Sequence, residues 1–340
     1  MTLAISGTTG ITLAGQFDSA STFGYRNRII NGLMATDQRN AAASQTFTAA
    51  AALAYSVDRW YGYCTGANVT GQQVAGSTTP TNTQFRYRFT GAASVTAVGF
   101  GQRIEQKNCY DMAGSTCTLS ADLAISATLT TVTWTASYAT TTADTFGSLA
   151  SPTVTQIATG TFTVSATVTN FTTNISVPAA ATTGIQIVFT VGALTAGLTW
   201  TIGNVQFEKG STATSFDYRP YGTELALCQR YLPAFTAVSG TVGPLPGIAT
   251  ALTTNVNLIF NHPVPARIPG TGVIVSGSTH FQFSNNDGNS ASTAVSFSSS
   301  SPNASQLAIT VASSRGATTT PGWIYANTAS AILYITGCEL

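Results

Sequence analysis

Carboxylates come first among the residues that could do chemistry, because glycoside hydrolysis needs two of them facing each other across a cleft. The chain of 340 residues carries twelve Asp and Glu. Four of these, Glu105, Asp111, Asp122 and Asp144, fall in a long run of predicted strands. No spacing singles out a pair among them, so we interpret them as surface or junction residues.

Nucleophilic and metal chemistry find even less support. The two histidines, His262 and His280, both lie in the C-terminal third, His262 in the turn-like segment NHPVP, and no Gly-x-Ser-x-Gly motif occurs. There is no Cys-x-x-Cys pair and no cluster of histidines. The sequence therefore predicts a protein that is not an enzyme and that uses no metal and no cofactor.

Five cysteines are scattered along the chain: Cys64, Cys109, Cys117, Cys228 and Cys338. An odd number at irregular spacing is not a disulfide framework. Cys109 and Cys117 flank a short loop and could be bridged, but reduced, buried thiols are favoured. The N-terminal sequence MTLAISGTTGITLAGQFDS has neither the basic region of a signal peptide nor the length of a membrane span, which predicts a cytoplasmic origin.

Aromatic residues offer a better-supported chemistry, the non-covalent binding of sugars, which uses ring faces and neutral hydrogen bonds. Trp323 and Tyr325 follow a Pro-Gly turn, where exposed and buried positions remain equally open. We predict ligand contacts in the distal part of the chain at Trp323, Tyr325, His280 and Phe281. Three further candidate sugar-binding residues lie earlier in the chain: Trp60, Tyr61 and Tyr63. For Trp60, packing in the core is favoured over ligand binding. The segment SNNDGNS (284–290) is interpreted as a turn and not as a calcium site.

Strands must position these residues, because hydrophobicity alternates with a period of two along most of the chain. The clearest segments are 85–91, 131–138, 160–169, 185–192, 198–207 and 254–260. Helices are predicted only for the Ala-rich segment 41–60 and for GTELALCQRYL (222–232), where Thr223 would be the N-cap. The pattern predicts an all-β protein with a jelly-roll-like β-sandwich followed by a smaller distal β-domain.

Three regions follow from this pattern. Residues 1–40 are a short N-terminal segment, residues 41–222 supply the sandwich, and residues 223–340 form the distal β-domain with a short leading helix. Only 7% of the residues are charged, with 13 basic and 12 acidic side chains and a formal net charge of +1. Such a neutral surface of hydroxyls and amides suits tight assemblies, and two lysines in the whole chain argue against nucleic acid as a partner.

The few charges are concentrated in two segments, YRNRIINGLMATDQRN (25–40) and NVQFEKGSTATSFDYRPYGTELALCQRY (204–231). Because aromatic residues interleave with charges of both signs, we predict a domain junction or subunit contact here and disfavour a solvated linker. The residues assigned to it are Arg26, Arg28, Asp37, Arg39, Glu208, Asp217, Arg219, Glu224 and Arg230. Whether Asp37 or Arg39 contacts the group from Glu208 to Arg219 stays open.

The segments NRIINGLMATDQRN, YSVDRWY and WTIGNVQFEKGSTATSFDYRPYGTELALCQRYL together resemble a family of tailed-bacteriophage and prophage virion proteins, usually tail fibres or related appendages. The resemblance covers roughly residues 27 to 231. It implies a jelly roll similar to carbohydrate-binding modules, an N-terminal segment that anchors the chain to the virion, a variable distal tip and assembly as a homotrimer.

These features lead to the expectation of a tail fibre or receptor-binding subunit of the virion, made in the host cytoplasm. Its partners would be further copies of itself, other phage tail or capsid proteins, and a host-surface polysaccharide or lipopolysaccharide, with no insertion into a membrane. One alternative is a purely structural capsid-bound fibre or decoration protein. A second alternative is a glycan depolymerase.

Overall fold

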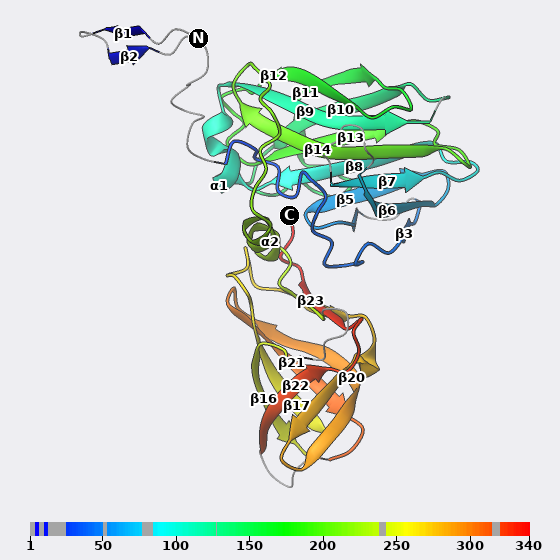
Figure 1. Ribbon diagram of the computed structural model, residues 1–340, viewed down its shortest axis with the longest axis vertical. Helices are drawn as coiled ribbons and strands as arrows, with labels where there is room; N and C mark the ends of the chain where they lie inside the picture. Colours follow the sequence, from blue (N-terminus) through cyan, green and yellow to red (C-terminus); the bar gives the residue numbers. More distant parts are fainter. Residues whose placement is uncertain are drawn as a thin grey trace.

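Two antiparallel sheets of six strands each form a β-sandwich, and a closed barrel follows it (Figure 1). The computed structural model describes residues 4–6, 10–12, 25–49, 53–76, 84–126, 128–237, 243–314 and 320–340. The first sheet has the order β11 (Val154–Thr163), β10 (Thr131–Ala139), β13 (Ile185–Val191), β8 (Ala97–Ile104), β5 (Trp60–Thr65), β4 (Ala54–Tyr55). The second has the order β12 (Thr169–Ser176), β9 (Thr116–Ile125), β14 (Thr199–Lys209), β7 (Phe85–Thr90), β6 (Val69–Ala75), β3 (Gln45–Phe47). The predicted all-β sandwich is confirmed.

Alternation along the strands explains the core between the two sheets. In β10, Val132, Trp134 and Ala136 are buried while the threonines between them face outward. On the core face of the second sheet, the ring of Trp200 from β14 stacks on Phe89 from the neighbouring strand β7, with centroids 5.4 Å apart. Each large apolar side chain buried in this way stabilises the fold by about 1.5–3 kcal/mol.

The helix predicted over residues 41–60 is wrong, because this segment supplies β3 and β4 and the start of β5. Phe47 and Trp60 are both fully buried in the sandwich core. The ring of Phe47 also covers Gly62, where a Cβ atom would lie 2.6 Å from the ring. Helix propensity differs by only tenths of a kcal/mol among most residues, so burial of these two aromatic side chains decides the structure.

Residues 25–40 pack into the sandwich, so the boundary predicted at residue 40 lies inside it. Ile29 and Met34 are fully buried in the same core. Asn27 donates from Nδ2 to the Val205 carbonyl (2.9 Å), and Asn31, at φ 56°, donates to the carbonyls of Thr36 (2.8 Å) and Asp58 (3.0 Å). Before residue 25, the structure describes one antiparallel pair, β1 (Ala4–Ser6) and β2 (Gly10–Thr12). Residues 1–3, 7–9 and 13–24 of the predicted anchoring segment lie outside the described residues.

The distal β-domain is a six-stranded barrel, closed by the pairing of its first and last strands. Its order is β16 (Gly247–Leu252), β17 (Asn255–Asn261), β21 (Ala304–Val311), β20 (Gly288–Ser300), β19 (Phe281–Asn285), β22 (Thr320–Ala326). Beside it lies a small sheet of β15 (Ala234–Thr236), β23 (Ile332–Thr336) and β18 (Gly272–Val275), and a short 3₁₀ turn, η2 (Ser278–His280), precedes β19. The barrel has a core of its own, with Leu258, Phe283 and Leu307 fully buried.

A helix, α2 (Tyr221–Gln229), lies between the sandwich and the barrel, and the C-terminus returns to the same place (Figure 1). The predicted leading helix is thus present, but Pro220 occupies the N-cap position instead of Thr223, and no side chain caps it. Cys228 and Tyr231 are fully buried against Ile30. The remaining short helices, α1 (Gln106–Cys109) and η1 (Tyr110–Met112), connect β8 to β9.

Candidate functional site

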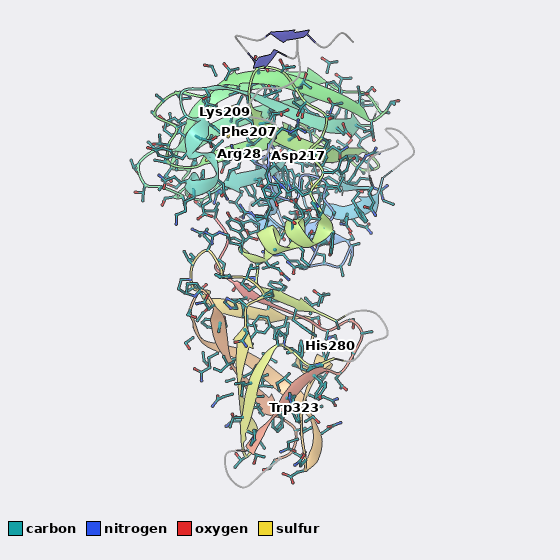
Figure 2. All side chains as sticks on the ribbon, turned by 60° about the vertical axis from the view of Figure 1, so that its left-hand side comes forward. Arg28, Phe207, Lys209, Asp217, His280 and Trp323 are labelled. Atoms are coloured by element: carbon teal, nitrogen blue, oxygen red, sulfur yellow. The ribbon has the colours of Figure 1, made fainter. Side chains whose placement is uncertain are left out.

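The two charged segments meet on the sandwich, where Figure 2 shows Arg28, Phe207 and Asp217 close together. The backbone N–H groups of Arg26 and Asn27 donate to Asp217 Oδ2 at 2.9 and 3.3 Å. Arg219 donates from Nη1 to the Ile29 carbonyl (3.0 Å) and forms an ion pair with Glu224 (3.1 Å). The closing segment therefore holds residues 25–31 in place through a carboxylate and a guanidinium.

Asp37 and Glu208 serve local turns instead of meeting each other. Asp37 accepts hydrogen bonds from the backbone N–H groups of Asn40 (3.1 Å) and Ala42 (2.9 Å). Glu208 accepts from Gln206 Nε2 (2.9 Å) and from the Thr214 backbone N–H (2.8 Å). The hydrogen bonds of Asp37 are thus made within residues 37–42, and those of Glu208 within residues 206–214.

Arg39 reaches the far end of the chain. Arg39 Nη2 lies 2.7 Å from Glu339 Oε1, and Arg59 Nη1 lies 2.7 Å from Glu339 Oε2. The guanidinium of Arg59 also stacks on the ring of Tyr231 at 3.6 Å and donates to the Arg103 carbonyl at 2.5 Å. We call these four residues, Arg39, Arg59, Tyr231 and Glu339, the junction cluster. It joins the sandwich to the segment that follows the barrel.

Arg230 adds a second ion pair at the same junction, with Glu105 of the sandwich at 2.9 Å. The Tyr231 hydroxyl also donates to Glu105, at 2.7 Å. Burial by itself would raise the pKa of Glu105, but the hydrogen bonds from Arg230 and Tyr231 outweigh it and hold the pKa below its ordinary value. Arg230, for which the sequence predicts a junction role, thus connects the end of α2 to Glu105 of the sandwich.

The other carboxylates tested for catalysis each have a partner of their own. Asp111 pairs with Arg28 at 2.8 Å, and Asp122 accepts from the side-chain amides of Asn170 and Asn204 at 2.9 and 2.8 Å. Asp144 accepts from the Gln106 backbone N–H at 2.7 Å. Every one of these contacts fixes a loop or a sheet face, which is a structural role.

Trp323 is the predicted ligand residue that stands out in the structure. It lies on β22 with 54% of its side chain exposed, beside a groove of about 430 Å³. The groove is lined by Ile248, Asn285, Asn286, Thr320, Pro321 and Gly322. A Cβ atom at position 322 would lie 2.4 Å from the Ser284 carbonyl, so glycine is required for the close approach of β22 to β19. Trp323 thus lines the groove together with two asparagines, of which Asn285 also accepts from the Asp287 backbone N–H at 3.0 Å.

The remaining predicted contacts do not all join Trp323. Tyr325 is half-buried on the same face, two residues along β22. Phe281 is fully buried in the barrel core, so its prediction as a ligand contact is wrong. His280 lies nearer the sandwich end of the barrel than Trp323 (Figure 2), where its Nδ1 is 2.8 Å from Ser276 Oγ. The candidate site therefore keeps Trp323 and Tyr325 and gains Asn285 and Asn286.

The early aromatic candidates belong mostly to the sandwich core. Trp60 is fully buried and stacks on Phe100, with centroids 4.8 Å apart, and Tyr61 is also buried. Tyr63 is half-buried, and its ring covers Gly99, where a Cβ atom would lie 2.1 Å away. Core packing, the favoured interpretation of Trp60, is confirmed.

All five cysteines are free and buried, including Cys109 and Cys117. Burial raises the pKa of Cys117 to about 11 and that of Cys109 to about 12, which keeps both as unreactive thiols at neutral pH. We expect a thiol reagent to label no cysteine in the native protein within minutes and all five after denaturation without reductant. Fewer than five labelled thiols in the denatured protein would reveal a disulfide.

Two general features complete the description of the site. Within the described ranges, no group of three or more His, Cys, Asp or Glu side chains is arranged to hold a metal ion. Of the helices in those ranges, none has the length and hydropathy of a membrane span.

Comparison with known proteins gives matches among solved structures alone. No family model matches the sequence, and no curated protein matches it. The enzymatically active domain of tailspike protein 4 of bacteriophage CBA120 is similar at 17% identity and a TM-score of 0.36, over 55% of this chain. This chain spans 22% of the length of that structure.

Carbohydrate-binding modules are also among the similar structures. A CBM4 module has 15% identity and a TM-score of 0.29 over 53% of this chain and 98% of its own. A family 22 carbohydrate-binding module of Clostridium thermocellum has 14% identity and a TM-score of 0.32 over 47% of this chain and 91% of its own.

Sequence reasoning did not identify Glu339 or the two asparagines beside Trp323. The sequence predicts a turn at Asn285 and Asn286, and this turn joins β19 to β20, with Asn285 aligned with Gly288. Their second role depends on the pairing of β19 with β22, which brings Ser284 opposite Trp323. Strand pairing over nearly 40 residues leaves no trace in local sequence.

Proposed function

We propose that this protein is a non-catalytic, glycan-binding subunit of a virion appendage, a tail fibre or receptor-binding protein of a tailed bacteriophage. The observation that carries the glycan-binding part is the exposed indole of Trp323 beside the groove formed by Asn285, Asn286 and Thr320. The virion part is supported by the resemblance of residues 27–231 to phage appendage proteins.

The chemistry of the groove suits a neutral part of a sugar chain. An indole face packs against the C–H groups of a sugar ring, and side-chain amides both donate and accept hydrogen bonds with its hydroxyl groups. A groove of about 430 Å³ holds only one or two sugar units, so a single site binds weakly. A homotrimer would offer three such sites to one cell surface and gain avidity without new contacts.

Replacement of Trp323 by alanine is expected to weaken binding of the purified protein to host cells or host polysaccharide at least tenfold, because an exposed indole in a groove is a typical hot spot, worth about 2 kcal/mol. The matched control is Tyr110→Ala, since Tyr110 is an aromatic residue with 60% exposure on the sandwich. Adsorption measured by surface plasmon resonance should fall for the first variant and stay at the wild-type level for the second.

The rival functions give different results in the same samples. Equal adsorption of wild type and Trp323→Ala would contradict the assignment of this groove. Binding of the chain to assembled capsids without any binding to host glycans would favour a structural fibre or decoration protein. Release of reducing sugar from host polysaccharide would show a depolymerase. A mass of one chain by light scattering would contradict the homotrimer, and immunogold labelling of virions tests the location.

A further inference from the structure

The outer face of the second sheet of the sandwich carries a small basic cleft. It has a volume of about 270 Å³ and lies over strands β6, β7, β9 and β14. Its polar lining consists of Arg86, Arg88, Ser126, Thr199 and Thr201. The cleft is on a different domain from the Trp323 groove, and no predicted site residue belongs to it.

Strand geometry brings the two arginines to the same face. Arg86 and Arg88 are two residues apart on β7, while Tyr87 and Phe89 between and after them point into the core. Thr201 of β14 pairs directly with Arg88. A Cβ atom at Gly203 would lie 2.9 Å from Arg86 Cγ, so the absent side chain at position 203 leaves the space through which Arg86 crosses the sheet.

The charges in the cleft do not balance. Asp122 is the carboxylate whose field acts on Arg86, and it is shared with the side-chain amides of Asn170 and Asn204. Arg86 is only 2% exposed; its burial lowers its pKa, and Asp122 offsets this in part. Arg88 is exposed, and it belongs to none of the ion pairs described at the junction and on the sandwich. The lining of the cleft therefore includes two guanidinium groups and no carboxylate, in a protein whose total net charge is +1.

We propose that this cleft binds the carboxylate of an acidic sugar unit, a uronic acid for example, as a second glycan contact. Arg88 supplies a planar fork that matches a carboxylate, and the hydroxyl groups of Thr199 and Thr201 lie beside it for the ring hydroxyls. The volume is just below the range of about 300–1,000 Å³ typical of ligand pockets, which suits one charged unit. The sandwich would thus select for negative charge on a polymer that the barrel groove also holds.

The test uses the full-length protein and two probes with the same sugar chain, of which only the first is charged: tetragalacturonate and its fully methyl-esterified form. Isothermal titration calorimetry at 50 mM salt should show binding of the acid and at least tenfold weaker binding of the ester. Binding of the acid should weaken further at 500 mM salt, because an exposed guanidinium is screened. Arg88→Gln should weaken binding of the acid at least tenfold.

The control variant is Arg26→Gln, which removes the same charge from a residue that holds Asp217 by its backbone N–H. It should bind the acid like the wild type. The proposal is overturned if the acid and the ester bind equally, if Arg88→Gln keeps wild-type affinity, or if inorganic phosphate at the same concentration displaces the acid completely. If Trp323→Ala still binds the acid but no longer binds host glycan, the cleft at Arg88 and the groove at Trp323 are supported as two independent sites.

Discussion

Replacement of Arg59 by methionine is expected to lower the free energy of unfolding by about 3 kcal/mol, near the lower end of the range for breaking a buried ion pair. The Arg59 side chain is 1% exposed and holds Glu339 at 2.7 Å. Methionine keeps much of the volume, so the change removes the ion pair, the hydrogen bond to the Arg103 carbonyl and the cation–π contact with Tyr231 without leaving a large cavity. Glu339, itself 10% exposed, would keep Arg39 as its partner, which limits the loss. Urea unfolding followed by tryptophan fluorescence measures the change.

The matched control for this experiment is Arg28→Met. Arg28 also forms an ion pair, with Asp111, but the two side chains are 28% and 52% exposed. Exposed pairs contribute about 0–1 kcal/mol, so this variant should unfold close to the wild type. In the double variant Arg59→Met/Glu339→Gln, the loss should be smaller than the sum of the two single losses, because both changes remove the same Arg59–Glu339 ion pair. Equal free energies of unfolding for Arg59→Met and Arg28→Met would contradict the assigned role of the junction cluster.

The protein is expected to lose stability as the pH rises from 5 to 7, through the buried carboxyl of Asp58. Burial raises the pKa of Asp58 to about 7, and Arg39 at 3.9 Å offsets this only in part. In the unfolded chain the pKa is about 3.9, so between about pH 4 and pH 7 the folded state binds a proton that the unfolded state has released. Stability from this group therefore falls with rising pH and levels off above pH 7.

Asp58→Asn tests this pH dependence, because asparagine cannot titrate. Between pH 5 and pH 7 the wild type should lose about 2 kcal/mol relative to the variant, from the general value of about 1.4 kcal/mol per unit of pKa shift. Unfolding in urea at pH 5, 6, 7 and 8 gives the slope of the free energy of unfolding against pH for the wild type and for Asp58→Asn. Parallel slopes for the two proteins would show that Asp58 is ionised in the folded state throughout.

The strands of the sandwich could be predicted because one face of each lies in the core. Val132, Trp134 and Ala136 alternate with threonines, and the residues of β13 alternate in the same way. β9 could not be found by this rule, since nine of its ten residues are buried on both faces. The Ala-rich segment 41–60 was wrongly predicted as a helix because its helix propensity is weak. Contacts of Phe47 and Trp60 with distant strands decide its structure.

The candidate site was predictable only where one residue type carried the chemistry. An exposed tryptophan after a Pro-Gly turn could be suspected from sequence, and Trp323 is exposed. Phe281, the first residue of β19, could not be distinguished from a surface residue because the barrel closure decides which face is inside. The Arg39–Glu339 pair spans 300 residues, and no local pattern relates its two ends.

The chain crosses between sandwich and barrel twice, and this has a mechanical consequence. One crossing follows α2, and the other follows β23, where Arg267 donates to the Cys338 and Glu339 carbonyls at 3.0 and 2.7 Å. The two crossings are tied together, since the Arg267 backbone N–H donates to the Arg230 carbonyl at 2.7 Å. A force applied at Trp323 would be divided between the covalent connection through α2 and the ion pairs that hold Glu339 on Arg39 and Arg59 of the sandwich. The barrel would therefore act as a lever fixed to the sandwich, able to transmit torque, whereas a single linker would let it swivel.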